Sequence, residues 1–344
     1  MNAYTRRRLL ASTILGVCTI PFVSLLRLVQ GAGSWQSGVA LGFCLGFAVG
    51  LAEFFLFRGQ WIRLPFLLHL ALKSVILMLV MYGAFAALNV LDVLLEGLSW
   101  PGYWGVLVAP STLIGLVQGL AVVAVLLFFV QLDRLLGPGV LLGLFMGRYH
   151  RPRTEERIFM FLDLRGSTAI AERLEPGRYF EFLRRCFGAM SEPILASKAE
   201  IYQYVGDEVV LTWRMRTGLE EASCVRVFFA IEAQLERRGA EFLTEFNAAP
   251  EFKAGVHAGE VIAAQIGDLK REVAYSGDVL STAARIQSLC NELGHRLLVS
   301  RTVFSRMHLG SDFEIESLGP IPLRGRVEEV ELFGVAPKAS ARDT

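Results

Sequence analysis

The C-terminal half of the chain is organised around the segment Ile158-Phe159-Met160-Phe161-Leu162-Asp163-Leu164-Arg165-Gly166-Ser167-Thr168. It opens with a continuous apolar run of strand length, which is typical of a buried strand. Asp163 closes that run, and the Ser167-Thr168 pair is a helix-start signal. The segment therefore predicts a buried strand that delivers an aspartate to a short turn before a helix.

A β-hairpin is predicted further along the chain. Two β-rich runs, 200–205 and 208–213, flank the dipeptide Gly206-Asp207 and place Asp207 at the hairpin tip. If the hairpin neighbours the strand that ends at Asp163, the two carboxylates converge at one edge of the sheet. Such a pair suits Mg²⁺, which takes oxygen ligands and retains waters and substrate phosphates. Taken alone, either aspartate is more often a turn-forming residue.

The rest of this half alternates helices with strands, which predicts an α+β sandwich with its helices on one face of the sheet. The expected helices run from Ser167 to about Lys198, with a break near Pro176-Gly177, and from about Leu219 to Asn247. The expected strands are Lys253–His257, Val261–Ile266 and Glu272–Tyr275.

Four segments in this order resemble the successive signatures of class III adenylate and guanylate cyclases, and four signatures in register are far more specific than any one. They are Phe161-Leu162-Asp163-Leu164-Arg165-Gly166-Ser167-Thr168, Tyr204-Val205-Gly206-Asp207-Glu208, Gly255-Val256-His257-Ala258-Gly259-Glu260-Val261 and Gly277-Asp278-Val279-Leu280-Ser281-Thr282-Ala283-Ala284-Arg285. The resemblance covers roughly Glu156 to Val335. It implies a ferredoxin-like α+β fold, related to polymerase palms, that works as a homodimer with active sites between the subunits.

The resemblance also implies roles for individual residues. Asp163 and Asp207 match the two metal-binding aspartates, with the Leu164 carbonyl as a further ligand of two Mg²⁺ or Mn²⁺ ions per site. Arg285 matches the catalytic arginine that stabilises the charge developing on the α-phosphate, for which a fixed guanidinium is chemically apt. Arg324 lies where the family often has a basic residue against the triphosphate.

The turn after Asp163 is the remaining element of the predicted substrate site. Its backbone N–H groups lie at a helix start and suit phosphate, so we expect Gly166, Ser167 and Thr168 to bind the substrate. The implied reaction is attack of the ribose 3′-hydroxyl of a nucleoside triphosphate on its own α-phosphorus, which releases pyrophosphate. Metal ions, positioning and electrostatics supply most of the acceleration in such chemistry.

Three positions depart from the family pattern. Gln203 stands where a lysine usually reads adenine, Ala274 where its aspartate or threonine partner usually stands, and Ser281 where an asparagine usually orients the ribose. Gln203 can donate and accept, so it suits adenine and equally guanine. The glutamate and cysteine of familiar guanylate cyclases are absent, and adenylate cyclases dominate chains of this layout, so we expect ATP as substrate. Loss of one polar contact at Ser281 removes on the order of 1–3 kcal/mol of transition-state stabilisation, which predicts reduced rather than abolished activity.

Two other functions fit parts of the pattern. The segment 205–209 faintly resembles the Gly-Gly-Asp-Glu-Phe turn of diguanylate cyclases, but it lacks the second glycine and the phenylalanine, and 277–285 fits class III cyclases instead. The other alternative is a domain that binds nucleotide or only dimerises and relays a signal. The three altered positions favour this alternative, whereas the intact Asp163, Asp207 and Arg285 oppose it.

The N-terminal half has the composition of a membrane domain. Hydrophobic residues make up 53% of the chain, its mean hydropathy is +0.46, and nearly all charge follows about Arg148. A formal net charge of +1 argues against a nucleic-acid-binding protein. Four segments approach or exceed the ~18–20 apolar residues needed to cross a bilayer. They are Leu9–Val29, Ser37–Phe57, Phe66–Leu88 and Val106–Val130.

The distribution of Lys and Arg predicts the orientation of these spans. Arginines precede the first span, lie between the second and third and follow the fourth, whereas the loop from Asp92 to Trp104 has neither Lys nor Arg. By the positive-inside rule both ends are cytoplasmic, which predicts a multi-pass protein of the cell membrane with a cytoplasmic catalytic domain. The predicted parts are a transmembrane domain at 1–131, a connector at 132–156 broken at Gly137-Pro138-Gly139, a cyclase domain at 157–336 and a tail at 337–344.

The second and third predicted spans contain the ionisable residues Glu53, His69 and Lys73. His69 and Lys73 are four residues apart and share a helix face. A contact of Glu53 with either of them predicts a packing or sensing element between helices. The alternative is that all three lie near the cytoplasmic ends and extend to the headgroups.

Overall fold

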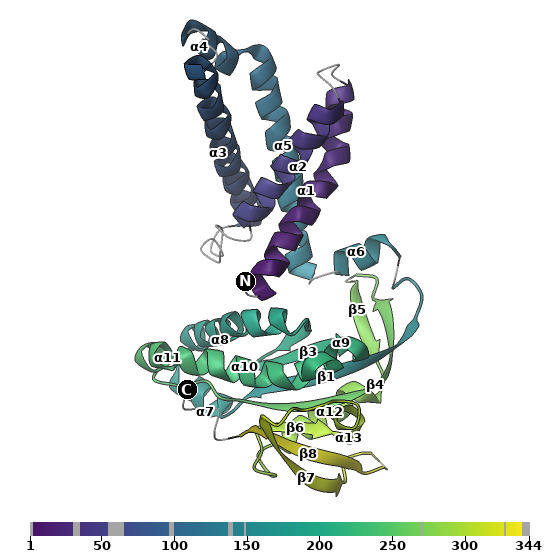
Figure 1. The fold of residues 1–344 in the computed structure, drawn as a ribbon. Coiled ribbons are helices and arrows are strands. Elements are labelled where there is room, and N and C mark those ends of the chain that lie inside the picture. The colour runs from purple at the N-terminus through teal and green to yellow at the C-terminus, as the bar shows by residue number, and fades with distance from the viewer. Residues whose placement is uncertain are drawn as a thin grey trace. The chain divides into compact units, whose positions relative to one another are not determined.

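The computed structural model describes residues 3–29, 35–53, 65–95, 100–136, 140–147, 149–269, 271–326 and 328–338. The chain divides into two compact units, Met1–Leu136 and Gly137–Thr344. The first unit is helical and the second is built on a sheet (Figure 1).

The helices of the first unit follow the predicted spans with different boundaries. They are α1 (Ala3–Val29), α2 (Trp35–Leu51), α3 (Phe66–Leu95), α4 (Trp100–Val108) and α5 (Pro110–Leu136). The fourth predicted span is divided between α4 and α5, because Pro110 lacks an amide hydrogen and suits the first position of a new helix. The end of the second predicted span and the loop after it lie outside the described residues.

Two helices of the described residues are long and apolar enough to cross a membrane. These stretches are Phe66–Gly83 in α3 and Pro110–Asp133 in α5. Ser12–Leu25 in α1 and Gly42–Leu51 in α2 are shorter apolar segments. Length and composition thus support two of the four predicted spans directly.

Glycines on α2 let it approach α1 closely. The spacing Gly42, Gly46, Gly50 repeats every four residues, and a β carbon added at Gly46 would lie 2.3 Å from Thr19 Oγ1. The Thr19 hydroxyl donates to the carbonyl of Gly42 at 2.6 Å. Small residues at this spacing are what membrane helices use to bring two backbones together, so α1 and α2 form one packed pair.

An ion pair joins α3 to the end of α2. Lys73 Nζ lies 2.8 and 2.9 Å from the two carboxylate oxygens of Glu53, and both side chains are at most 2% exposed. The predicted contact between helices is therefore confirmed for Glu53 and Lys73. The alternative that these side chains extend to the headgroups is wrong for this pair, because the two charges satisfy each other inside the unit.

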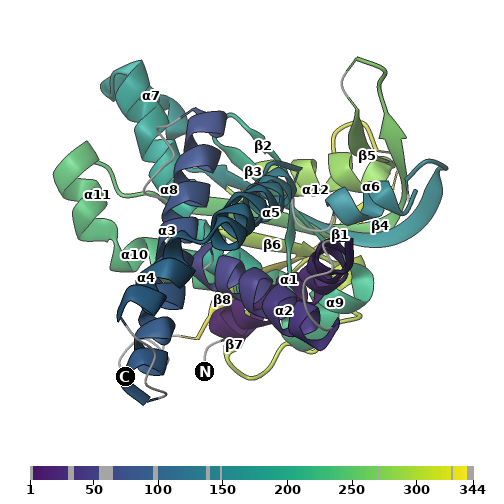
Figure 2. The same ribbon diagram turned by 90° about the horizontal axis from the view of Figure 1, so that it is seen from above.

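The second unit is a mixed sheet with strand order β2-β3-β1-β4-β6-β8-β7, and β5 pairs with β4. The β4–β6 pair is parallel and the other pairs are antiparallel. The strands are β1 (Arg153–Leu164), β2 (Glu200–Val205), β3 (Glu208–Arg214), β4 (Phe252–Ile266), β5 (Glu272–Ser276), β6 (Leu297–Ser300), β7 (Phe313–Ile321) and β8 (Val330–Pro337). Figure 2 shows β5 and the end of β4 as an arm at the edge of the unit.

Helices cover both faces of this sheet, so the expectation of helices on one face is wrong. The residues Ile158, Met160 and Leu162 of β1 pack with α8 (Pro176–Ala196) and α10 (Ser223–Arg237). On the other face Phe159 and Phe161 pack with α12 (Asp278–Ser288). Because β1 is apolar at consecutive positions, both of its faces need cover.

The remaining helices, together with β4, can be compared with the predicted segments. They are α6 (Val140–Phe145), α7 (Ser167–Arg173), α9 (Met215–Leu219), α11 (Gly239–Phe246), α13 (Arg301–Phe304) and a 3-10 turn at Glu220–Ala222. The break near Pro176 is confirmed, since α7 ends at Arg173 and α8 begins at Pro176. The long helix predicted over 219–247 is instead divided at Arg238, whose backbone is not helical. The two strands predicted over 253–266 are one, because β1 pairs with β4 continuously past Gly259.

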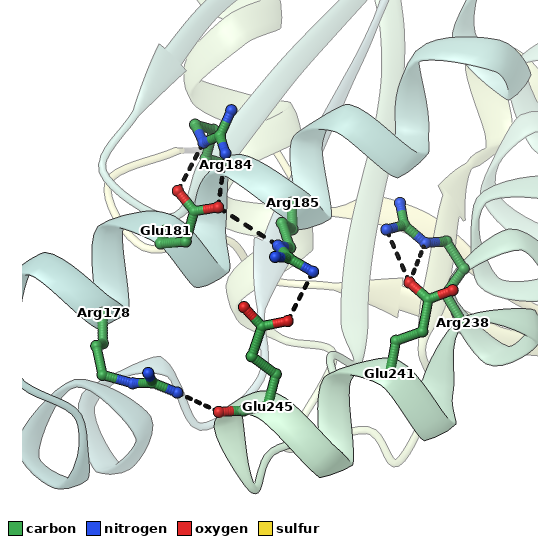
Figure 3. A network of polar contacts seen from close by, with 7 residues as sticks. All are labelled: Arg178, Glu181, Arg184, Arg185, Arg238, Glu241 and Glu245. Atoms are coloured by element: carbon green, nitrogen blue, oxygen red, sulfur yellow. Dashed lines mark hydrogen bonds and ion pairs between the residues drawn. The ribbon is translucent and has the colours of Figure 1, made fainter. Parts of the chain in front are cut away.

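Polar contacts join α8 to α11 at the surface (Figure 3). Arg185 Nη1 lies 2.7 Å from Glu245 Oε2, and Arg178 donates to the carbonyl of Glu245. Exposed ion pairs contribute only about 0–1 kcal/mol each. The contact between these helices therefore rests mainly on Phe182, whose ring packs against Phe246 with centroids 5.5 Å apart.

The Glu53–Lys73 pair predicts a strong coupling in a double-mutant cycle. Glu53→Gln or Lys73→Met alone breaks this buried ion pair and leaves its other charge uncompensated by it, which costs about 3–5 kcal/mol of folding free energy. Removing both charges together should recover much of that loss. Thermal unfolding of the full chain in detergent measures the loss of stability in the two single variants and in the double variant. If the double variant lost the sum of the two single losses, the pair would not be coupled.

Candidate active site

Asp163 and Asp207 lie at adjoining strand ends. Asp163 is the penultimate residue of β1, and the pairing of β1 with β3 sets it opposite Glu208. Asp207 directly precedes Glu208 in the turn that follows β2. The two carboxylates therefore come to the same edge of the sheet, as the hairpin pattern predicts.

Two donors that the sequence pattern did not single out hold one oxygen of Asp163. Lys253 Nζ lies 3.2 Å from Asp163 Oδ2, and Gln287 Nε2 donates to the same oxygen at 3.0 Å. In the described part of the chain, Oδ1 of Asp163 and the carboxylate of Asp207 have no hydrogen-bonding or ion-pair partner. The described residues thus satisfy one of the four carboxylate oxygens and leave three for another ligand.

The sequence carries a signal for each of these donors. Lys253 is the cross-strand neighbour of Asp163 in the antiparallel β1–β4 pair, which follows once the register of that pair is known. Gln287 lies on the buried face of α12 beside Ala283 and Ile286, where a polar side chain calls for a partner.

The electrostatics of this edge favour a cation. Partial burial, together with the charges of Asp163 and Asp207, raises the pKa of the Glu208 carboxyl to about 7. Burial and the same two aspartates raise the pKa of Tyr179 on α8. Burial is the larger cause of both shifts, and the negative charge of Asp163 and Asp207 adds to it; a bound cation would relieve this second part.

The donors at this edge fit Mg²⁺ or Mn²⁺. Within the described ranges no group of three or more His, Cys, Asp or Glu side chains is arranged to hold a metal ion. Magnesium is usually held by one or two carboxylates and completes its shell with waters and substrate phosphates. Asp163 and Asp207, with the carbonyl of Leu164 next to Asp163, match that kind of site.

The turn after Asp163 has the expected geometry. Gly166 adopts a left-handed conformation, with φ 65°, and precedes α7, which begins at Ser167 and Thr168. No side chain caps the start of this helix. The Arg165 N–H donates to the carbonyl of Glu251 at 2.8 Å, which ties the turn to the end of the sheet.

The helix α12 carries Ser281 and Arg285 and packs tightly on β4. A β carbon added at Gly255 would lie 2.3 Å from the backbone nitrogen of Gln287, so only glycine lets the helix come this close. The exposed Ser281 donates its hydroxyl to the carbonyl of Asp278 at 2.9 Å. This hydroxyl is therefore engaged within the first turns of the helix.

The loop that contains Arg324 lies beside Arg285. A β carbon added at Gly325 would lie 3.5 Å from Arg285 Nη2. Arg326 anchors the loop, since it pairs with Asp278 at 3.2 Å and donates to Thr282 Oγ1 at 2.8 Å. The structure thus brings the predicted triphosphate-binding loop to the predicted catalytic arginine.

Gln203 and Ala274, the two predicted base-reading residues, lie on strands that are not paired with each other. Gln203 is exposed on β2, and Ala274 is half-buried on β5. Their chain neighbours meet, because the rings of Tyr202 and Tyr275 pack edge to face with centroids 5.2 Å apart. The two segments are therefore joined through these tyrosines.

His257, in the third signature, has a structural environment. Its ring is only 5% exposed, and Nδ1 lies 2.8 Å from Ser300 Oγ and 3.2 Å from Thr302 Oγ1. Burial and the nearby positive charge of Arg326 lower the pKa of His257 to about 4. The histidine is therefore held neutral in the folded chain at physiological pH.

Comparisons with known proteins agree with this geometry. The family model described as adenylate and guanylate cyclase catalytic domain matches residues 150–336. Adenylate cyclase 2 of Rhizobium meliloti (strain 1021) is 34% identical over 228 residues, which are 66% of this chain and 63% of the relative. An adenylate cyclase of Anabaena cylindrica is 22% identical over 187 residues, which are 53% of this chain and 37% of the relative. The chain thus spans less than two thirds of the length of either relative.

A solved structure shows the same fold. A bacterial light-regulated adenylyl cyclase superposes with a TM-score of 0.54 at 21% sequence identity, and the match covers 64% of this chain and 66% of that one. The mixed sheet with helices on both faces is therefore an architecture already seen in a solved protein.

The environment of His257 predicts a pH-dependent stability. Unfolded histidine binds a proton near pH 6.5, whereas the folded group binds one only near pH 4. The unfolded state therefore binds more protons in this window, and the free energy of unfolding falls as the pH drops from about 6.5 to 4, by up to ~3 kcal/mol. His257→Gln should remove this contribution.

Chemical unfolding of wild type and His257→Gln at several pH values measures it. The difference between the two proteins isolates His257, because the raised pKa of Glu208 adds a slope of opposite sign to both. The exposed His308, changed to Gln, serves as the matched control and should keep the wild-type slope. A His257→Gln variant with the wild-type slope would contradict the prediction.

Proposed function

The chain belongs to the family of adenylate and guanylate cyclases, and from that membership we propose that it is a membrane-bound adenylate cyclase, which converts ATP to 3′,5′-cyclic AMP and pyrophosphate. The observation that carries the proposal is the meeting of Asp163 and Asp207 at one sheet edge, where three of their carboxylate oxygens have no partner among the described residues. The two relatives named as adenylate cyclases support ATP over GTP as the substrate.

In the proposed metal site, some residues bind the ions and others hold Asp163 in position. Two Mg²⁺ or Mn²⁺ ions bound by Asp163, Asp207 and the Leu164 carbonyl would supply activation of the 3′-hydroxyl and charge for the pyrophosphate group. Lys253 and Gln287 fix the Asp163 carboxylate by its Oδ2. Held in this way, the carboxylate keeps Oδ1 directed for ligation and loses little entropy when it binds.

Positive groups on α12 and the adjoining loop complete the chemistry. The Arg285 guanidinium stabilises the charge that develops on the α-phosphate, where a fixed planar donor is most effective. Gly325, which lies beside that guanidinium, has a left-handed backbone with φ 75°, a conformation that glycine adopts without strain. Arg324 adds a second positive charge for the triphosphate, and the amides of Gly166 to Thr168 offer it N–H donors.

A homodimer is part of the proposal. Gln287 reaches Asp163 in the same chain, and Arg285 precedes Gln287 by two residues, which is about 200° around the helix. Arg285 therefore points away from the metal-binding edge of its own chain. A second copy, presenting its own aspartates to Arg285, would complete the site. Exposed apolar residues near the hairpin tip and on the β4–β5 arm suit such an interface; they are Tyr204, Val205, Ile262, Ile266 and Leu269.

The membrane assignment extends the proposal to the first unit. Two helices of spanning length, the two shorter apolar segments and the close α1–α2 packing support four spans. The arginine-free loop between the third and fourth spans supports cytoplasmic ends. The catalytic unit is then cytoplasmic, where ATP is available.

One observation favours a second candidate, a nucleotide-binding domain with little or no turnover. The Ser281 hydroxyl is occupied by the carbonyl of Asp278, so it has no free donor for the ribose. Together with Gln203 and Ala274, this residue leaves the substrate less firmly oriented than an asparagine would.

The full chain, purified in detergent, should convert ATP to cyclic AMP in the presence of Mg²⁺ or Mn²⁺. Asp207→Asn should lower the rate by roughly 10²–10³-fold or more, because the site loses one of its two metal-binding carboxylates and with it the charge stabilisation that the ions supply. Cyclic nucleotides and pyrophosphate are quantified with ATP and with GTP as substrate. Cyclic GMP as the main product would make the protein a guanylate cyclase. Bound nucleotide without product would favour the second candidate.

Co-expression of two inactive variants tests whether the active site is shared between two subunits. Asp207→Asn and Arg285→Ala should each be inactive alone, and co-expression of the two should restore part of the activity, because one of the two sites in a mixed dimer is intact. A monomeric form with full activity would overturn the dimer.

Introducing the family's usual asparagine at position 281 should increase the activity. Ser281→Asn should raise kcat/KM for ATP about tenfold, which corresponds to ~1.4 kcal/mol. Ser288→Asn is the matched control, since Ser288 is also exposed on α12 and also donates to the carbonyl three residues earlier, that of Arg285. Steady-state kinetics on both variants test this. Equal rates for Ser281→Asn and wild type would show that the ribose is oriented by other groups.

A further inference from the structure

Arg157 is a charged residue in the interior of the catalytic unit. It lies on β1, on the α12 side of the sheet, and its exposed fraction is 0%. Its Nη1 lies 2.7 Å from Glu200 Oε2 on β2, and its Nε lies 2.9 Å from Glu155 Oε2 on β1. Its Nη2 is buried and has no hydrogen-bond partner in the part of the chain that the structure describes.

Stability alone does not account for this arginine. Burying a charge has a high desolvation cost, and a donor left unsatisfied adds about 1–3 kcal/mol. A well-packed apolar side chain at the same place is often at least as stable. The arrangement is better explained by what the guanidinium holds in place.

The guanidinium contacts an aromatic cluster that joins two strands. The Arg157 guanidinium carbon lies 4.6 Å from the ring centroid of Tyr275 on β5. That ring packs edge to face against Tyr202 on β2, at 5.2 Å, and against Phe159 on β1, at 5.5 Å. In the sheet β2 pairs with β3, and β5 pairs with β4, so backbone hydrogen bonds do not join them. Side chains around Arg157 make this connection instead.

The joined residues are the immediate neighbours of the base-reading positions. Tyr202 precedes Gln203, and Tyr275 follows Ala274. The β2–β3 pairing shifts register between Ile201 and Gln203, which leaves Tyr202 without a cross-strand partner. The backbone at this bulge is therefore held by the packing of the Tyr202 ring rather than by the ladder.

We propose that Arg157 is a positioning residue for base recognition: by tying β2 to β5 it sets the separation at which Gln203 and the backbone around Ala274 receive the purine. The inference rests on the proposed function and deepens it. A glutamine amide can match the hydrogen-bonding edge of adenine or of guanine, depending on how it is presented. Discrimination between them then depends on how rigidly its strand is held.

Two variants probe the connection from its two ends. Arg157→Lys keeps a positive charge beside Glu200 but loses the planar fork that bonds two carboxylates and stacks on a ring. Tyr275→Leu keeps apolar bulk but removes the ring between Arg157 and Tyr202. Both should lower the ratio of kcat/KM for ATP to that for GTP about fivefold or more, mainly through KM, with kcat less affected.

Two further variants serve as controls. Tyr275→Phe keeps the ring and should keep the wild-type ratio. Arg306→Lys alters an exposed ion pair with Glu156, also on β1, and should leave the ratio unchanged.

The measurement uses the full chain in detergent. Steady-state rates with ATP and GTP are combined with competition of the two unlabelled nucleotides against a fluorescent ATP analogue, and with thermal unfolding. Variants that lose activity equally with both nucleotides at an unchanged ratio would overturn the inference, as would a wild type that binds both nucleotides equally. A wild type without cyclase activity would defeat the proposed function, and the binding ratio would then still decide the role of Arg157.

Discussion

The register of β1 against its two neighbours is the constraint on which the site depends. Antiparallel pairing sets Asp163 opposite Glu208 on one side and opposite Lys253 on the other. Because side chains alternate between the faces of a strand, a shift of one residue would turn Asp163 toward α8 and α10 and would bury it among apolar side chains. The apolar residues of β1 would be buried on either face, so they alone do not prevent that shift. Asp163 at the end of the strand does, because its carboxylate cannot be buried among apolar side chains. The strand that builds the core therefore also aims the carboxylate.

A second close contact carries this order to α12. The absence of a side chain at Gly255 lets the helix lie directly on β4, and from there Gln287 reaches Asp163. The same helix presents Arg285 to the opposite side, and Arg326 docks the neighbouring loop on its first turns. A small shift of α12 on β4 would move Gln287, which holds Asp163 at the proposed metal-binding edge, together with Arg285. The close contact at Gly255 thus helps to position both Asp163 and Arg285, although the two residues belong to different active sites in the proposed dimer.

How much the sequence predicts follows the range of the interactions involved. The hairpin and the turn after Asp163 are local patterns, and both were predicted to within one residue of their boundaries. The helix α12 was not among the predicted helices, and an amphipathic segment would not in any case reveal which face of a sheet it covers. Lys253 and Gln287 were missed for a related reason: their partner lies far away in the chain and becomes visible only with the register. The division of the helix at Arg238 was missed although Gly239, a weak helix former, follows it directly; beyond the division, Phe242 of α11 packs against Phe182.

Each unit contains a buried, positively charged side chain whose partners lie on other helices or strands. Lys73 joins α3 to the end of α2, and Arg157 joins β1 to β2 and, through a ring, to β5. Buried ion pairs contribute little net stability, since desolvation offsets most of the attraction. Their energy depends steeply on geometry, however, because a displaced partner leaves an uncompensated charge in a medium of low polarity. An apolar contact tolerates sliding, whereas such a pair does not. Where the backbone ladder leaves two segments unconnected, a buried charge is the kind of contact that fixes their separation.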